Sequence, residues 1–130
     1  MTDALFEELL GKTLASVEGK VGGDEIVFVT DSGERFKLYH RSDCCESVSV
    51  EDICGDLSDL VGEPILLAEE AVSLEDPPGY HDESQYRESF TWTFYKLSTI
   101  KGSVTIRWLG ESNGYYSESV DFCKMTEVPR

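Results

Sequence analysis

The residues best suited to chemistry in this chain stand close together, in a stretch that begins at His40. It reads His-Arg-Ser-Asp-Cys-Cys-Glu, and it places an imidazole, two adjacent thiols and two carboxylates within seven residues. A third cysteine, Cys54, follows soon after. Side chains of these types bind zinc, activate a thiol or surround a small ligand. The spacing of the residues has to decide among these chemistries.

A structural zinc site is one alternative, with His40, Cys44, Cys45 and Cys54 as ligands of suitable type. Zinc needs three or four ligands that converge at about 2 Å. The stretch contains no Cys-x-x-Cys pair. If strand alternation continues through it, His40 and Cys44 point inward and Cys45 points outward, so the two thiols do not share an ion. We therefore favour buried thiols beside a hydrogen-bonded histidine, and expect no metal or other cofactor.

A small-ligand or nucleotide pocket around the same stretch is a second alternative. Two tyrosines at a later turn would complete it, since aromatic rings offer a stacking surface for a base. Trp92 and Trp108 share the alternation of apolar neighbours and are expected in the core. The pocket residues would be His40, Asp43, Cys44, Glu46, Tyr115 and Tyr116. A molecule bound there would stabilise the fold.

No catalytic signature accompanies these residues. The chain has no phosphate-binding glycine motif, no nucleophile elbow and no calcium-loop pattern. Acidic residues are so common that a pair of carboxylates carries no weight without geometry. We expect that the protein is not an enzyme, and we assign no catalytic residue.

The charge of the chain favours a binding function instead. Its 130 residues include 26 acids and 11 lysines or arginines, for a net charge of −15. Residues 43–88 hold fourteen of the acids and one base, so this segment alone carries −13. Such a surface repels free nucleic acid and attracts a basic protein surface.

Seven acids in this segment are predicted to bind the basic partner. They are Asp52, Asp56, Asp59, Glu69, Glu70, Glu75 and Asp76. Exposed charges are screened within about 10 Å at 0.1 M salt, so binding should weaken as the salt concentration rises. The sequence leaves the identity of the partner and the oligomeric state open.

A mostly antiparallel β fold is expected to position these residues. The runs 25–30 and 35–40 alternate apolar and polar residues, and the intervening Asp31-Ser32-Gly33-Glu34 is typical of a hairpin turn. Residues 64–74 are apolar enough for a buried strand. The predicted fold class is α+β, predominantly antiparallel β: about seven strands in a curled sheet, barrel or small sandwich, with one N-terminal helix and a short helical turn near residues 55–61.

A second hairpin is predicted around Asn113–Gly114, a strong turn signal. A three-residue loop would pair Ile106 with Phe122 and Trp108 with Val120. That register gives one apolar face, and register follows the hydrophobic pattern. The last two strands are therefore expected to be neighbours in one sheet.

The chain is expected to form a single domain over residues 1–130. Residues 75–89 contain Pro-Pro-Gly and few apolar side chains, which predicts a mobile surface loop. The N-terminus has no basic leader and no apolar run approaches 18 residues, so we expect a cytoplasmic protein without membrane contact. Its four cysteines would then be reduced thiols.

Three segments carry a resemblance to a known family: LYHRSDCCESVSVEDICGDL, TWTFYKLSTIKGSVTIRW and GESNGYYSESVDF. The chain resembles an uncharacterised family of small bacterial and bacteriophage proteins, a domain of unknown function, from about Gly11 to Phe122. The family brings no activity and no functional residue. The resemblance implies a phage or bacterial origin, where small acidic proteins often bind and block host proteins. On that analogy, the basic partner would be a host nucleic-acid-binding protein that this protein engages or inhibits.

Overall fold

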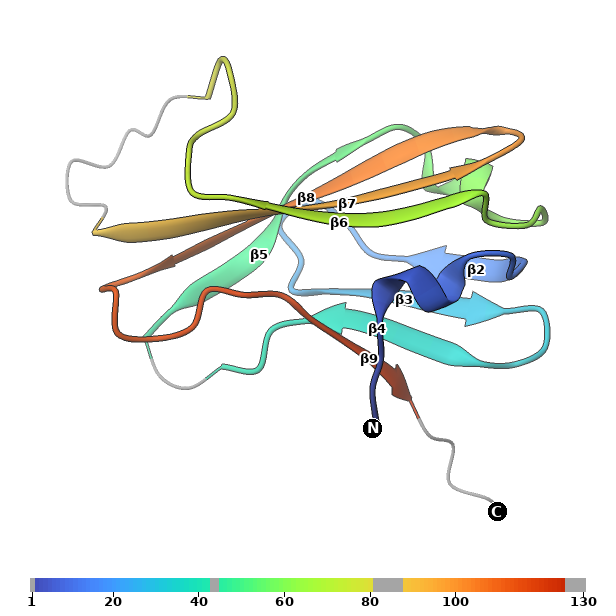
Figure 1. The fold of residues 1–130 in the computed structure, drawn as a ribbon, viewed down its shortest axis with the longest axis horizontal. Helices are drawn as coiled ribbons and strands as arrows, with labels where there is room; N and C mark the ends of the chain where they lie inside the picture. The colour runs from blue at the N-terminus through green and yellow to red at the C-terminus, as the bar shows by residue number, and fades with distance from the viewer. Residues whose placement is uncertain (1, 43–44, 81–87, 126–130) are drawn as a thin grey trace.

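The computed structural model describes residues 2–42, 45–80 and 88–125, which form nine strands and two turns of 3₁₀ helix (Figure 1). The strands are β1 (Thr2–Asp3), β2 (Leu14–Glu18), β3 (Glu25–Thr30), β4 (Arg35–Tyr39), β5 (Ser47–Cys54), β6 (Leu67–Ser73), β7 (Ser89–Thr99), β8 (Gly102–Ser112) and β9 (Asp121–Met125). The 3₁₀ turns are η1 (Phe6–Leu9) and η2 (Leu57–Leu60).

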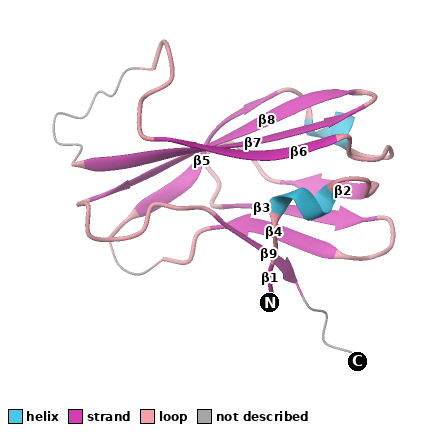
Figure 2. Ribbon diagram, in the orientation of Figure 1, coloured by secondary structure: helices cyan, strands magenta, loops and turns pink. Residues whose placement is uncertain are grey.

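The strands form two sheets that pack face to face. The five-stranded sheet has the order β1-β9-β4-β3-β2 and the four-stranded sheet has the order β5-β8-β7-β6. All strand pairs within them are antiparallel. Figure 2 shows the sheets as an upper and a lower layer, with η1 at the front of the view below β6. Neither sheet closes into a barrel within the described residues, so the predominantly antiparallel fold is a small sandwich.

Alternation along the strands places the core between the two sheets. In β3, Ile26 and Phe28 are fully buried, and Phe28 pairs with Phe36 of β4. In β7 the buried residues that face this core have odd numbers, such as Tyr95 and Leu97. Side chains on successive strand positions point to opposite faces, so each sheet presents one apolar face to the other.

Aromatic rings fill the core where η1 enters it. Phe6 of η1 lies 4.6 Å from Tyr95 of β7 and 5.3 Å from Phe122 of β9, measured between ring centroids. Phe122 in turn stacks on Phe36 at 5.5 Å. Phe6 therefore joins the two sheets, and burial of a phenylalanine contributes about 1.5–3 kcal/mol to stability.

The prediction of a full N-terminal helix is wrong, because only the single turn η1 forms. Phe6 and Leu9 are buried, whereas Leu10 is exposed and its backbone is extended. Gly11 follows with a φ of +80° and donates its N–H to the carbonyl of Ile65 at 2.8 Å. This backbone bond ties the chain to the segment that precedes β6, so no second helical turn follows η1. The helical turn expected near residues 55–61 is present as η2.

The strand count is nine and not seven for two reasons. The stretch after Tyr39 separates β4 from β5, and the N-terminus adds the two-residue strand β1. The hairpin predicted between β3 and β4 is confirmed, with Glu25 opposite Tyr39 and Val29 opposite Arg35.

The predicted hairpin at Asn113–Gly114 is wrong. β8 pairs with β7 along its whole length, from Gly102 to Ser112, and with β5 on its other side. β9 belongs to the other sheet, where Phe122 pairs with Leu38. Residues 113–120 therefore cross between the sheets. Both edges of β8 are already occupied by longer partners, and this outweighs the local turn signal.

The segment 64–74 forms a strand, but not a buried one. Ile65 and Ala68 are buried, whereas residues 69–72 are exposed. β6 is the last strand of its sheet and pairs only with β7 among the described residues. The apolar residues of this segment are therefore buried only near its start, and the acids that follow face solvent.

Candidate functional site

The fold separates the seven predicted partner-binding acids into two groups. The first group lies on β5 and η2, and the second lies on β6 and directly after it. The groups are Asp52, Asp56 and Asp59, and Glu69, Glu70, Glu75 and Asp76. Two strands, β8 and β7, stand between β5 and β6 in the sheet. A single partner surface therefore does not follow from the sequence segment alone.

The first group shapes the local backbone. Asp56 precedes η2 and accepts hydrogen bonds from the N–H of Ser58 at 2.9 Å and from its hydroxyl at 2.7 Å. These bonds from Ser58 lower the pKa of the Asp56 carboxyl. Asp52 accepts the N–H of Ile53 at 2.9 Å. The Asp56 carboxylate thus satisfies an N–H group that the turn of η2 leaves open.

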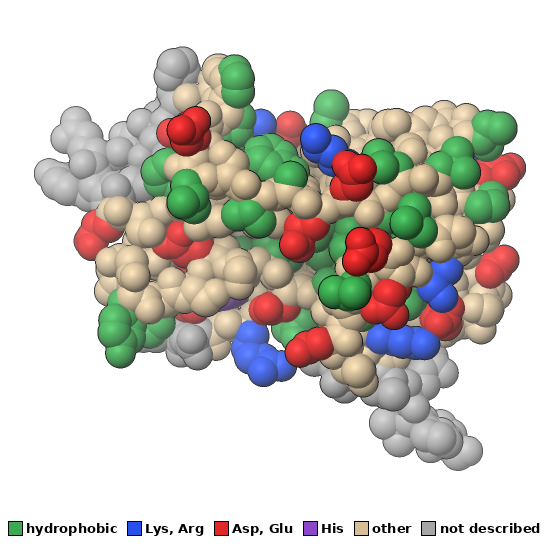
Figure 3. Space-filling model, viewed as in Figure 1, with side chains coloured by type: hydrophobic (Ala, Val, Ile, Leu, Met, Phe, Trp, Pro, Cys, Tyr) green, Lys and Arg blue, Asp and Glu red, His purple; other side chains and the backbone are tan. Residues whose placement is uncertain are grey.

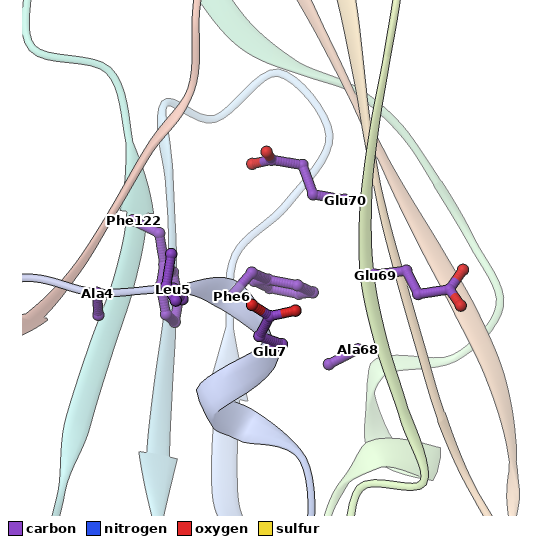
Figure 4. Close-up of a pocket in the computed structure, with 8 residues that line it drawn as sticks. All are labelled: Ala4, Leu5, Phe6, Glu7, Ala68, Glu69, Glu70 and Phe122. Atoms are coloured by element: carbon purple, nitrogen blue, oxygen red, sulfur yellow. The ribbon is translucent and has the colours of Figure 1, made fainter.

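Two members of the second group, Glu69 and Glu70, border a cavity on the face where acidic side chains gather in Figure 3. The cavity has a volume of about 460 Å³ and lies between η1, β6 and β9. Figure 4 shows the ring of Phe6 near its centre and Phe122 on the β9 side. Glu69 and Glu70 line it from β6, and Glu7 lines it from η1. The cavity thus combines aromatic rings with acidic residues from η1 and β6.

The two glutamates of β6 point in opposite directions, as strand alternation requires (Figure 4). Glu70 points toward the cavity and accepts a hydrogen bond from the hydroxyl of Tyr95 at 2.6 Å. Burial, followed by this contact with Glu70, raises the pKa of Tyr95. Glu69 points to the other side of β6, where the strand register places Lys96 opposite it. A molecule along β6 would therefore meet a carboxylate on each side of the strand.

Sequence reasoning missed Glu7. It lies between the buried residues Phe6 and Leu9, so the local pattern does indicate an exposed acid. Nothing local indicates that η1 packs beside β6. That neighbourhood depends on the backbone bond from Gly11 to Ile65.

The residues after β6 fold over the outer face of the four-stranded sheet. Asp76 accepts the indole N–H of Trp92 at 3.0 Å, and the ring of Tyr80 meets Trp92 edge-on at 4.8 Å. Arg107 lies over the same indole at 5.1 Å. Trp92 and Trp108 are both fully buried, as predicted, but only Trp108 belongs to the core cluster between the sheets, and Trp92 lies on the opposite face of its sheet. Of the loop predicted at 75–89, residues 81–87 lie outside the described residues.

His40 and Glu46 form a buried pair after β4. The His40 Nε2 lies 3.1 Å from a carboxylate oxygen of Glu46, and their side chains are 4% and 0% exposed. The His40 Nδ1 lies 2.7 Å from the carbonyl oxygen of Ser119. A carbonyl only accepts, so Nδ1 donates its hydrogen to Ser119, and Nε2 faces the carboxylate of Glu46. Both ring nitrogens are thus engaged, and the predicted inward direction of His40 is confirmed.

The other residues of the predicted pocket do not extend this pair into a described cavity. Asp43 and Cys44 lie outside the described residues. Tyr115 is 83% exposed, and its ring meets that of Tyr116 edge-on at 5.1 Å. A second cavity, of about 340 Å³, lies around the β2–β3 turn. Neither it nor the larger cavity is lined by His40 or Glu46.

The cysteines differ from the expectation of four reduced thiols. Cys45 is disulfide-bonded, whereas Cys54 and Cys123 carry thiols. Burial raises the pKa of the Cys123 thiol. In residues 2–42, 45–80 and 88–125, no cluster of three or more histidine, cysteine, aspartate or glutamate side chains is arranged to hold a metal ion. No helix in the same ranges has the length and apolar character to cross a membrane.

Comparison with known proteins assigns the chain to a family. No curated protein and no solved structure matches it. One family model does match, described as a domain of unknown function (DUF7448), and it covers residues 7–122. The match begins inside η1 and ends inside β9, and it includes Glu7, the acids of β6 and the His40–Glu46 pair. Because it spans most of the 130 residues, the chain belongs to the DUF7448 family.

Proposed function

We propose that this protein is a non-enzymatic binding protein that engages a basic surface of another protein through its acidic face. We define the acidic face as Glu7, Glu69 and Glu70 around the cavity between η1, β6 and β9. The observation that carries the proposal is the convergence of acids from two distant parts of the chain on one open cavity. Glu7 lies outside the acid-rich segment 43–88, so the grouping results from the fold and not from the position of these acids in the sequence.

The chemistry of the cavity favours a cationic side chain as its occupant. None of the residues that line it is a lysine or arginine. A lysine or arginine can lay its aliphatic stem on aromatic rings such as Phe6 and Phe122 while its charge reaches a carboxylate. Arginine can also bind a carboxylate through two hydrogen bonds. The net charge of −15 would further accelerate the approach of a basic partner.

The resemblance to bacterial and phage proteins supports a cellular setting for this proposal. We place the protein in the bacterial cytoplasm, as a product of a phage or bacterial genome. Its partner there would be a nucleic-acid-binding protein of the host, since such proteins carry basic surfaces. Occupation of that surface by the acidic face would block nucleic acid and so inhibit the partner.

A charge-matched pair of variants tests the proposal. Glu7→Lys with Glu69→Lys reverses two of the three charges of the acidic face, and Glu18→Lys with Asp24→Lys changes two acids beside the second cavity. Each substitution changes the charge by two, so both variants carry −11 in place of −15. Immobilised wild type and both variants are incubated with nuclease-treated bacterial lysate, and retained proteins are quantified by mass spectrometry.

We expect wild type and the control variant to retain the same basic proteins and the acidic-face variant to lose them. Retention should fall between about 0.1 M and about 1 M salt, where the screening length drops from about 10 Å to about 3 Å. Equal retention by both variants would contradict the proposal. So would an absence of basic proteins on the wild type.

A further inference from the structure

We propose that the partner docks on β6 as an extended strand that adds to the four-stranded sheet and carries basic residues. This inference rests on the proposed function, because it states how the basic partner binds the acidic face. β6 pairs with β7 from Leu67 to Ser73, and no described strand pairs with its other side. Alternate residues of such an edge direct their N–H and C=O groups outward, which is a template for another strand.

The other sheet edges are less available than that of β6. At the opposite edge of the same sheet, Val50 of β5 exchanges two backbone hydrogen bonds of 2.8 Å with Gly22 and Gly23. In the five-stranded sheet, β1 has two residues, and the start of β2 bonds to the chain at Gly62 through the carbonyl of Leu14. β6 therefore offers the longest edge that no other described segment bonds.

The N-terminal segment sets where this edge begins. Gly11 donates to the carbonyl of Ile65 at 2.8 Å, and Ile65 donates to the carbonyl of Lys12 at 2.9 Å. The N-terminal segment thus bonds the backbone of Ile65, and no described segment pairs with this edge from Leu67 onward. The open length of seven residues matches an ordinary strand of about 5–6 residues.

Side chains of an added strand would alternate between two acidic environments. Those on the inner side would enter the cavity that Glu70 and Glu7 line, and those on the outer side would lie near Glu69. Opposite charges on neighbouring strands attract when they share a face. Lysine or arginine on either side of the added strand would therefore find a carboxylate.

The same acids argue against a second copy of this chain as the occupant. Two β6 strands placed edge to edge would bring Glu69 and Glu70 of one copy beside those of the other. Like charges on paired strands are destabilising, and charge on an edge strand is a known means of preventing self-association. The edge thus discriminates by charge, since it repels itself and attracts a basic strand.

Three peptides test strand addition separately from charge. The parent is a peptide of about eight residues with alternating lysine and valine, near the usual strand length. The other two carry N-methyl groups on either the odd or the even backbone amides, which keeps the charge and removes alternate donors. In an added strand only one set of amides faces β6. Affinity of the full chain for each peptide is measured by fluorescence anisotropy, and hydrogen exchange is followed at residues 67–73.

We expect the parent to bind and one methylated isomer to lose at least about tenfold in affinity, while the other stays within about twofold. Alternate amides of β6 should gain protection. Equal binding of both isomers with no gain of protection at residues 67–73 would overturn strand addition and leave the proposed function intact. The lysate experiment tests that function by itself. A parent that fails to bind would also overturn strand addition. So would a free protein that sediments as a dimer with residues 67–73 already protected, because the edge would then hold a second copy.

Discussion

The acidic edge, formed by Glu69 and Glu70 of β6, and the polar cluster that follows β4 use the same kinds of side chain for opposite purposes. We define the polar cluster as His40, Glu46, Glu118 and the residues that hydrogen-bond to them. Its two glutamates are buried and face a histidine or hydroxyl groups. Glu7 and Glu69, by contrast, are exposed. An acid-rich composition alone therefore predicts neither stability nor binding, because the groups that face each carboxylate decide its role.

The His40–Glu46 pair gives the largest expected difference between the two regions. In Glu46→Ala the imidazole of His40 stays buried without its carboxylate partner, and breaking a buried pair costs about 3–5 kcal/mol. The free energy of unfolding is measured by urea denaturation. Glu69→Ala is the matched control on the acidic edge and should stay within about 0.5 kcal/mol of wild type. Comparable losses in the two variants would show that burial does not separate the regions.

Glu118 tests the second half of the polar cluster. Its carboxylate accepts the hydroxyl of Thr91 at 2.8 Å and that of Ser112 at 2.5 Å, and its backbone lies against Gly110. Glu118→Ala leaves both hydroxyls without this acceptor, so we expect a loss of about 1–3 kcal/mol in urea denaturation. Glu118→Gln keeps an acceptor oxygen and should recover part of that loss. If Gln were as harmful as Ala, charge and not hydrogen bonding would dominate here.

The sequence predicts what depends on local pattern. Alternation through β4 and the start of β5 correctly oriented Phe36, His40 and Val50, and the turn at Asp31–Glu34 correctly joined β3 to β4. Each of these features is decided by residues a few positions apart. The same holds for η2, where Asp56 caps the turn.

The sequence does not predict which distant segments become neighbours. Asn113–Gly114 has the local signal of a hairpin, yet β7 and β5 occupy both sides of β8, and β9 is left for the other sheet. The candidate site also depends on contacts between distant segments, because Glu7 reaches the cavity only where η1 packs beside β6. Trp92 is a further case: its alternation indicates burial, but residues 76 and 80 bury it on the outer face.

Two buried tryptophans sharpen the comparison near the acidic edge. The indole N–H of Trp92 donates to Asp76 in the segment after β6, whereas that of Trp108 makes no hydrogen bond among the described residues. Replacement of either by Phe removes a similar volume, so the difference between the variants reports the hydrogen bond. We expect Trp92→Phe to be less stable than Trp108→Phe by about 0.5–1.5 kcal/mol. Faster hydrogen exchange at Asp76, Gly79 and Tyr80 should accompany only Trp92→Phe. Equal exchange in the two variants would mean that this hydrogen bond does not hold the segment in place.

Substitution of Glu34 is expected to have the smallest effect on stability. Glu34 is a third kind of acid, since it is partly exposed and yet paired with two lysines. Lys12 and Lys124 each donate to it at 2.8 Å, and these hydrogen bonds lower the pKa of the Glu34 carboxyl from its usual 4.5 to about 2. A lowered folded-state pKa gives a stabilisation that is complete above about pH 4.5 and is lost as the pH falls toward about 2. Because solvent screens this site, Glu34→Gln should lower the free energy of unfolding by at most about 1 kcal/mol at neutral pH.

Thermal denaturation of wild type and Glu34→Gln across that pH range tests the sign of this effect. The gap between the two proteins should close as the pH falls from about 4.5 toward about 2, and should narrow with added salt at neutral pH. Glu69→Gln serves as the comparison from the acidic edge. It lies opposite a lysine across the strand pair but has no ion pair within the described contacts, so its effect should not follow this pH course. If the difference in thermal stability between wild type and Glu34→Gln widened on acidification, Lys12 and Lys124 would not stabilise the Glu34 carboxylate. The contrast between this paired acid and the unpaired Glu69 would then fail.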